Sequence, residues 1–185
     1  MKKKFVCLVF LLFCVSFARA PFSNPAFFGG NDNQVSIFWG AGVRHKSEFE
    51  NLHTFGVNYS QPNEFFRLCG RRNAELIWKR GAGDLSHHDN FMLGLSQDMM
   101  TPAIWRFYVG AMLGIYIRSD STNRISSLFT FGQKGFLGFI VNEHVTLEIY
   151  ARHFSNGTLT TTNSGYDFVG LSANWNFGRA REREK

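Results

Sequence analysis

Three residues near the C-terminus have the types and the spacing of a serine hydrolase. His153 and Ser155 are separated by one residue, and Asp167 follows beyond a polar turn. Alternate side chains of a strand share one face, so His153 and Ser155 would point the same way on a strand. A hairpin would then bring Asp167 back toward the histidine. A hydroxyl nucleophile beside a base, with an acid to orient that base, predicts attack on an acyl carbonyl.

Each of these residues has a defined role in such chemistry. Ser155 would attack an ester carbonyl, and His153 would take its proton and later give one to the leaving alkoxide. Asp167 would hold the imidazole in the required tautomer and stabilise its cation. Next to the nucleophile, the amide of Asn156 or nearby backbone N–H groups would hold the oxyanion. This mechanism needs no metal and no cofactor.

The segments that carry these residues have the pattern of β-strands. From Trp105 to Arg118, seven apolar residues occupy alternate positions, and their neighbours are mostly polar, small or amphipathic. Similar runs recur along the chain between turn residues, and no segment has a helical period. We therefore predict eight strands at about 34–43, 52–60, 72–80, 89–97, 104–118, 127–141, 145–155 and 166–177.

An all-β fold with this pattern has two interpretations. Eight antiparallel strands of about ten residues match the smallest outer-membrane barrels, whereas a soluble barrel or sandwich would turn its apolar faces inward. The long apolar faces, the opposite faces rich in Gly, Ser, Thr and Asn, and a final strand ending at Phe177 favour the membrane protein. The predicted fold is an eight-stranded antiparallel transmembrane β-barrel.

In this barrel the candidate site faces lipid. His153 and Ser155 share a face with the apolar residues of the seventh strand, and Asp167 does so on the eighth. Polar residues on a lipid-facing surface are expensive unless they serve a function. An even number of strands keeps both termini in the periplasm, which puts Ser155 at the outer end of its strand. In a Gram-negative bacterium it would meet the lipopolysaccharide of the outer leaflet, so the predicted substrate is a lipid ester.

The N-terminus has the features of an export signal. Lys2, Lys3 and Lys4 precede an apolar run, and Ala18-Arg19-Ala20 offers cleavage after Ala18 or Ala20. A retained membrane anchor is the alternative interpretation of this run. The predicted domains are a signal peptide at 1–20 and a single β-barrel at 21–185, with strands over about 34–177 and a charged tail at 178–185.

Charge and cysteine content argue against several classes of protein. The net charge falls from +6 to +2 once the four basic residues of the signal leave, and the remaining basic residues are mostly scattered. The sequence therefore has no cluster of basic residues that would predict nucleic-acid binding by the barrel. Cys7 and Cys14 also leave with the signal, so Cys69 can form neither an internal disulfide nor a Cys-based zinc site. The pair His87-His88 could suggest metal ligands, but adjacent strand residues face apart and a turn is the better interpretation.

The segment around Ser155 also resembles a known family. The stretch from His153 to Asp167 is similar to the outer-membrane lipid A 3-O-deacylases of the PagL type, which have an H-x-S-N motif on a late strand. In that family an Asn, a Gly and an acid follow the motif. The residues at matching positions are His153, Ser155, Asn156, Asn163 and Gly165.

The resemblance implies an eight-stranded barrel that removes the acyl chain ester-linked at position 3 of lipid A. It implies His153 as the base, Ser155 as the nucleophile and Asn156 as a contributor to the oxyanion hole. It also implies that Asn163 shapes the loop or the site. The acid of this family is Glu, whereas this chain has Asp167, which is one methylene shorter and requires a closer approach of the backbones.

Three functions stay open on the sequence. The first is a serine esterase of the Gram-negative outer membrane that deacylates lipid A, with lipopolysaccharide and the membrane as partners and no nucleic acid. The second is a non-enzymatic structural or adhesive barrel, in which replacing Ser155 has no chemical effect. The third is a barrel phospholipase or acyltransferase, because the residues that select the acyl chain are spread over the barrel surface. A homodimer is also left open.

Overall fold

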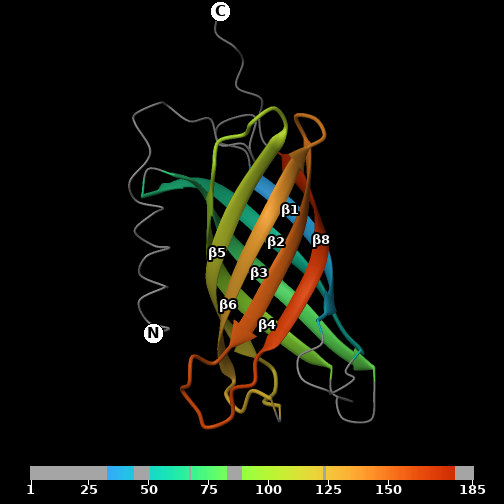
Figure 1. Cartoon of the computed structure of the whole chain (residues 1–185), viewed down its shortest axis with the longest axis vertical. Coiled ribbons are helices and arrows are strands. Elements are labelled where there is room, and N and C mark those ends of the chain that lie inside the picture. Colours follow the sequence, from blue (N-terminus) through green and yellow to red (C-terminus); the bar gives the residue numbers. More distant parts are fainter. Residues whose placement is uncertain (1–32, 44–50, 67, 83–88, 123, 178–185) are drawn as a thin grey trace, which may run out of the picture.

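Eight antiparallel strands form a closed barrel. The computed structural model describes residues 33–43, 51–66, 68–82, 89–122 and 124–177. Each strand pairs with the next, and the first pairs with the last (Figure 1). The strands are β1 (Asn33–Gly42), β2 (Asn51–Phe65), β3 (Leu68–Ala82), β4 (Asn90–Met100), β5 (Phe107–Arg118), β6 (Phe129–Ile140), β7 (Val145–Ser155) and β8 (Tyr166–Phe177). The predicted number of strands and the predicted bounds of β7 and β8 are confirmed.

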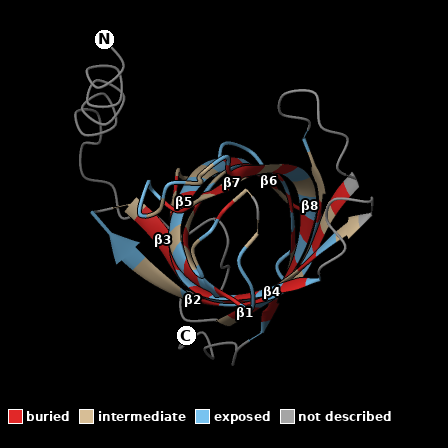
Figure 2. Ribbon diagram, turned by 90° about the horizontal axis from the view of Figure 1, so that it is seen from below, coloured by how far each residue is buried: buried red, intermediate tan, exposed pale blue. Residues whose placement is uncertain are grey.

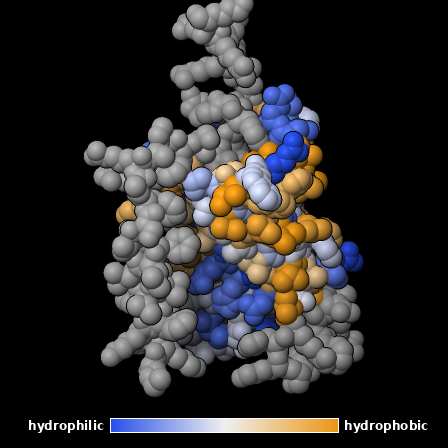
Figure 3. All heavy atoms as spheres, turned by 45° about the horizontal axis from the view of Figure 1, so that its top comes forward, coloured by the Kyte–Doolittle hydropathy of each residue, from blue (hydrophilic) through white to orange (hydrophobic). Residues whose placement is uncertain are grey.

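The two faces of the barrel wall differ as the alternation predicts. On β5, Ile115 is 48% exposed, whereas the next residue, Tyr116, is 1% exposed. Buried and exposed residues alternate along the strands (Figure 2), and hydrophobic residues gather on the visible outer surface (Figure 3). A closed sheet with an apolar exterior satisfies its backbone hydrogen bonds in a bilayer. The transmembrane barrel is confirmed, and the soluble fold with inward apolar faces is wrong.

Paired charges fill the lumen of the barrel. The Arg71 guanidinium lies 2.5 Å from Asp98 Oδ2 and 2.8 Å from Glu148 Oε1, and all three side chains are at most 2% exposed. In a second cluster, Arg152 pairs with Glu75. Buried charges are tolerated when each one is paired and hydrogen-bonded. The lumen is therefore a packed polar core that joins β3 to β4 and β7.

The β2–β3 hairpin is longer than predicted. The sequence pattern predicts these strands at about 52–60 and 72–80. Instead β2 and β3 stay paired to Phe65 and Leu68, with Pro62 opposite Arg71. The pairing of β1 with β2 stops at Ser60, so beyond that point one edge of β2 has no described partner strand. A proline lacks an N–H group but is tolerated on such an edge.

Strand β5 begins three residues later than predicted. Ile104 and Phe107 exchange backbone hydrogen bonds of 2.9 and 3.0 Å, and Trp105 between them has a φ of 60°. These contacts close a tight turn where the alternating apolar pattern predicted strand. Trp105 is 94% exposed, as suits an aromatic side chain at a membrane interface.

The connections differ between the two ends of the barrel. Segments 66–67, 101–106 and 141–144 join strands at one end, and the longer segments 43–50, 83–89, 119–128 and 156–165 do so at the other. Asn33 and Phe177 pair at the end with the short turns. Outer-membrane barrels have short periplasmic turns and longer extracellular loops, so the segment after Ser155 lies at the extracellular end.

The predicted signal peptide at 1–20 and the predicted charged tail at 178–185 lie outside the described residues. In the described part of the chain, no helix is long and apolar enough to cross a membrane.

Candidate active site

His153 and Asp167 lie directly opposite each other on β7 and β8. His153 Nδ1 is 2.7 Å from Asp167 Oδ1, and the two side chains are 40% and 39% exposed. Residues opposite each other in an antiparallel pair have Cβ atoms about 4.5–5.5 Å apart, so an aspartate is long enough to reach the ring. The contact favours the tautomer with the proton on Nδ1, which leaves Nε2 as the base.

Ser155 lies on the same outward face as His153. It is the last residue of β7, it is half-buried, and the register sets it beside Phe131 of β6. No hydrogen bond joins the Ser155 hydroxyl to the His153 ring, although both residues are described. Two residues on one strand face are about 6.8 Å apart along the chain. Catalytic hydrogen bonds are often long in a free enzyme and shorten when substrate binds.

The buried side chain of Asn156 holds the loop that follows Ser155. Its Nδ2 donates to Thr160 Oγ1 and, over 3.1 Å, to the carbonyl oxygen of Thr162. Its backbone N–H donates to Asn163 Oδ1 at 2.9 Å. The sequence suggested the Asn156 amide or nearby backbone N–H groups as oxyanion donors, and of these the side-chain amide is engaged within the loop. In contrast, the backbone N–H of Gly157 has no acceptor among the described residues.

A second extracellular loop braces this segment. Ile125 of loop 119–128 forms a β-bridge with Asn163. The Ser164 N–H donates to the Arg124 carbonyl at 2.8 Å, and Arg124 Nε donates to the Gly165 carbonyl at 3.0 Å. The two loops are thus bonded to each other just before the strand that carries the acid. These contacts between the two loops could not be predicted, because neither loop has a periodic sequence pattern.

Gly165 packs against the His153 ring. Its φ is +69°, and a Cβ atom there would lie 2.7 Å from His153 Cε1 and 3.1 Å from the carbonyl oxygen of Phe154. Both the left-handed backbone and the close contact require a glycine. The resemblance matched Gly165 without giving it a role. The only signal in the sequence is the Ser164-Gly165 turn pair before the last strand.

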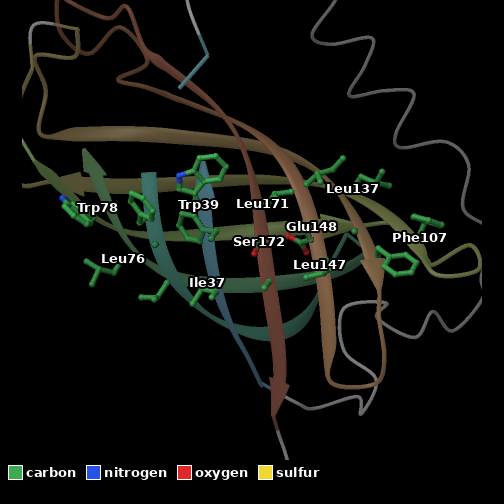
Figure 4. Close-up of a pocket in the computed structure, with 18 of the residues that line it drawn as sticks. Ile37, Trp39, Leu76, Trp78, Phe107, Leu137, Leu147, Glu148, Leu171 and Ser172 are labelled. Carbon is green, nitrogen blue, oxygen red and sulfur yellow. The ribbon is translucent and has the colours of Figure 1, made fainter. Parts of the chain in front are cut away.

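An apolar hollow on the outer surface lies below the site. Ile149 and Leu171 are opposite each other on β7 and β8, four residue pairs deeper in the membrane than His153 and Asp167. Apolar side chains from neighbouring strands line this hollow (Figure 4). They include Ile37, Trp39, Leu147, Ile149 and Leu171. The hollow offers room for a hydrocarbon chain deeper in the membrane than the site.

The site residues themselves supply few metal donors. In the described ranges, no group of three or more His, Cys, Asp and Glu side chains is placed to hold a metal ion. At the site, one imidazole and one carboxylate are bonded to each other. His87 and His88 lie outside the described residues.

Comparison with known proteins identifies the family. A sequence model of the lipid A 3-O-deacylase (PagL) family matches residues 53–176. The lipid A deacylase PagL of Bordetella bronchiseptica is 33% identical over 158 residues, which is 77% of this chain and 83% of the relative. This chain belongs to the lipid A 3-O-deacylase family. The family match includes the whole segment from His153 to Asp167.

Solved structures agree with this family in fold. The crystal structure of the outer membrane enzyme PagL matches with a TM-score of 0.63 at 18% identity, over 76% of this chain and 97% of that chain. Neisserial surface protein A matches with a TM-score of 0.59 at 12% identity, over 79% of this chain and 97% of that chain. At these low identities, the matches show that this chain has the same barrel fold as the two solved proteins.

Proposed function

We propose that this protein is a serine esterase that removes the acyl chain ester-linked at position 3 of lipid A in the outer membrane. The observation that carries the proposal is the 2.7 Å contact between His153 and Asp167. This contact lies on the same lipid-facing surface as Ser155. Family membership supports an ester hydrolase that acts on lipid A. A structural barrel leaves this contact without a purpose, since polar side chains are unfavourable on a lipid-facing surface.

The reaction proceeds through an acyl-enzyme. Ser155 Oγ attacks the ester carbonyl carbon while His153 Nε2 takes the hydroxyl proton. The tetrahedral intermediate collapses, the bond to the sugar oxygen breaks, and the protonated His153 gives its proton to that oxygen. A water molecule, deprotonated by His153, then attacks the acyl-serine carbonyl. The bond from the acyl carbon to Ser155 Oγ breaks, the protonated His153 returns its proton to Oγ, and the fatty acid leaves. Asp167 stabilises the imidazolium in both halves of the reaction.

The loop residues supply the oxyanion site and its shape. The Asn156 amide is bonded within the loop, so the Gly157 N–H is the available donor for the oxyanion. Asn163 fixes the Asn156 backbone, and thereby the position of Gly157. One donor aimed at an oxyanion is typically worth about 10²–10³ in rate. Asn156 and Asn163 therefore act by shaping the site, and a backbone N–H group, the second of the two kinds of donor suggested by the sequence, holds the oxyanion.

The substrate approaches from the lipid side. The site opens at the extracellular end of the outward face, where the lipopolysaccharide leaflet lies, and the apolar hollow below it suits an acyl chain. The charged lumen offers such a chain no apolar path. All three reacting residues come from one chain, so the chemistry requires no second copy, and the homodimer stays a prediction.

The test is the structure of lipid A from cells that make the protein. We would express the native chain in a Gram-negative host with ordinary lipid A, beside Ser155→Ala and a matched control, Ser164→Ala, in the adjoining loop. Mass spectrometry should show loss of one ester-linked acyl chain with the native protein and the control. Ser155→Ala should lower the rate by at least about 10⁴-fold. Deacylation by folded Ser155→Ala protein would refute the assignment.

A further inference from the structure

One polar residue on the lipid-facing wall is not used by the proposed mechanism. Gln133 is the fifth residue of β6 and points outward, where it is exposed. Its direct partners in the sheet are Leu113 on β5 and His153 on β7. In the described part of the chain its amide has no hydrogen-bond partner. An unsatisfied amide on a membrane-facing strand is unfavourable unless a ligand satisfies it.

The depth of Gln133 shows which part of a substrate it can meet. Strand β6 runs opposite to β7, so Phe131 lies beside Ser155 and Gln133 lies two residues deeper in the membrane. Two residues of a strand span about 6.8 Å. An ester carbonyl at Ser155 has its sugar toward the extracellular loops and its acyl chain toward the bilayer centre. Gln133 therefore lies on the acyl side of the ester.

The wall below Gln133 leaves space for that chain. The next outward residue of β6 is Gly135, where an added Cβ would meet no atom within 4 Å. Its neighbours across the sheet are Ala111 and Ala151, both small and exposed. An acyl chain leaving the ester can thus pass Gln133 at close range before it reaches the larger apolar residues beyond.

We propose that Gln133 determines acyl-chain specificity by binding a hydroxyl group that the chain carries close to the ester carbonyl. An amide both donates and accepts a hydrogen bond, and so does a hydroxyl group. A plain hydrocarbon chain would leave the Gln133 amide unsatisfied, which disfavours it relative to a hydroxylated chain. This inference rests on the proposed function and adds the chemical class of chain that the site prefers.

The test compares two synthetic glucosamine 3-O-acyl esters in detergent micelles. The two have the same chain length, and one carries a hydroxyl on the carbon β to the carbonyl. The native protein should hydrolyse the hydroxylated ester about tenfold faster in kcat/KM, as one neutral hydrogen bond provides. Gln133→Leu should remove this preference by slowing the hydroxylated ester alone. Leucine suits a lipid-facing position, so the variant should fold.

A matched control makes the same change elsewhere on the outward face. Gln61→Leu, on β2, should keep the tenfold preference. The inference is overturned if the native protein hydrolyses both esters equally, or if Gln133→Leu keeps the preference. If instead the proposed function is wrong, the native protein will hydrolyse both esters no faster than Ser155→Ala does. This result is distinct from a loss of preference alone.

Discussion

The lumen and the outward site hold polar residues in opposite ways. In the lumen, Arg71 is bonded to two carboxylates and is almost fully buried, and Arg152 and Glu75 form a second buried pair. On the outer wall, His153 and Asp167 are each about two-fifths exposed and share a single contact. That contact is made by Nδ1 of the imidazole, so Nε2 is not bonded to Asp167.

This difference separates residues that hold the fold from residues that act on a substrate. A charge in the lumen is paired with an opposite charge inside the barrel, and the loss of one member leaves an uncompensated partner. The residues of the outer wall retain unused donors and acceptors on a surface where lipid arrives. We therefore expect lumen substitutions to change stability with little effect on chemistry, and outer-wall substitutions to do the reverse.

Replacing the acid should give the largest effect of the three changes that follow. Asp167→Asn keeps the shape of the side chain but no longer stabilises the imidazolium or the required tautomer. We expect kcat/KM on micellar lipid A to fall about 10³–10⁴-fold, with little change in unfolding. Asp120→Asn removes an exposed acid from loop 119–128 and is the control. A loss below tenfold for Asp167→Asn would mean that the acid is not part of the site.

Breaking a lumen pair should lower stability instead. Glu75→Gln leaves Arg152 buried without its carboxylate, and we expect the free energy of unfolding to fall by about 3–5 kcal/mol. Urea unfolding in detergent micelles measures this change, with the exposed Glu64→Gln as the control. The folded fraction should keep nearly native activity. If Glu75→Gln instead removes activity without loss of stability, the distinction between lumen and wall fails.

A substitution that touches only the ring of the base should have a smaller effect. In Gly165→Ala, the new methyl group would lie 2.7 Å from His153 Cε1 and would displace the imidazole. We expect about a tenfold fall in kcat, because small misplacements of catalytic groups are costly. The left-handed backbone should lower stability by about 1–3 kcal/mol. Ser164→Ala tests whether any change in this loop has the same result, and equal losses for both variants would remove Gly165 from the site.

The barrel and the positions of the catalytic pair were accessible from sequence because they depend on local periodicity. Alternation of apolar and polar residues gave the strand count, the bounds of β7 and β8, and the shared outward face of His153 and Ser155. Register also follows this pattern, since a slip by one residue would turn Asp167 to the other face. The direct pairing with His153 explains how the shorter side chain of an aspartate reaches the ring.

Other features depend on contacts that a local pattern does not encode. Whether Pro62 ends a strand depends on where β1 stops, and the role of the Asn156 amide depends on the path of a ten-residue loop. The bracing of that loop by Arg124 joins segments about forty residues apart, and the sequence gives no signal for it. Gly165 is visible as a turn residue, but its contact with His153 is not.

The central claim is that a serine on the lipid-facing wall is the nucleophile, and covalent labelling tests it most directly. A long-chain alkylphosphonate ester in micelles should react with folded native protein, and peptide mass spectrometry should locate one adduct on Ser155. Deacylase activity should fall in proportion to labelling, and His153→Ala should prevent both. Protein that deacylates lipid A while its adduct lies elsewhere, or while Ser155 stays unlabelled, would contradict the account.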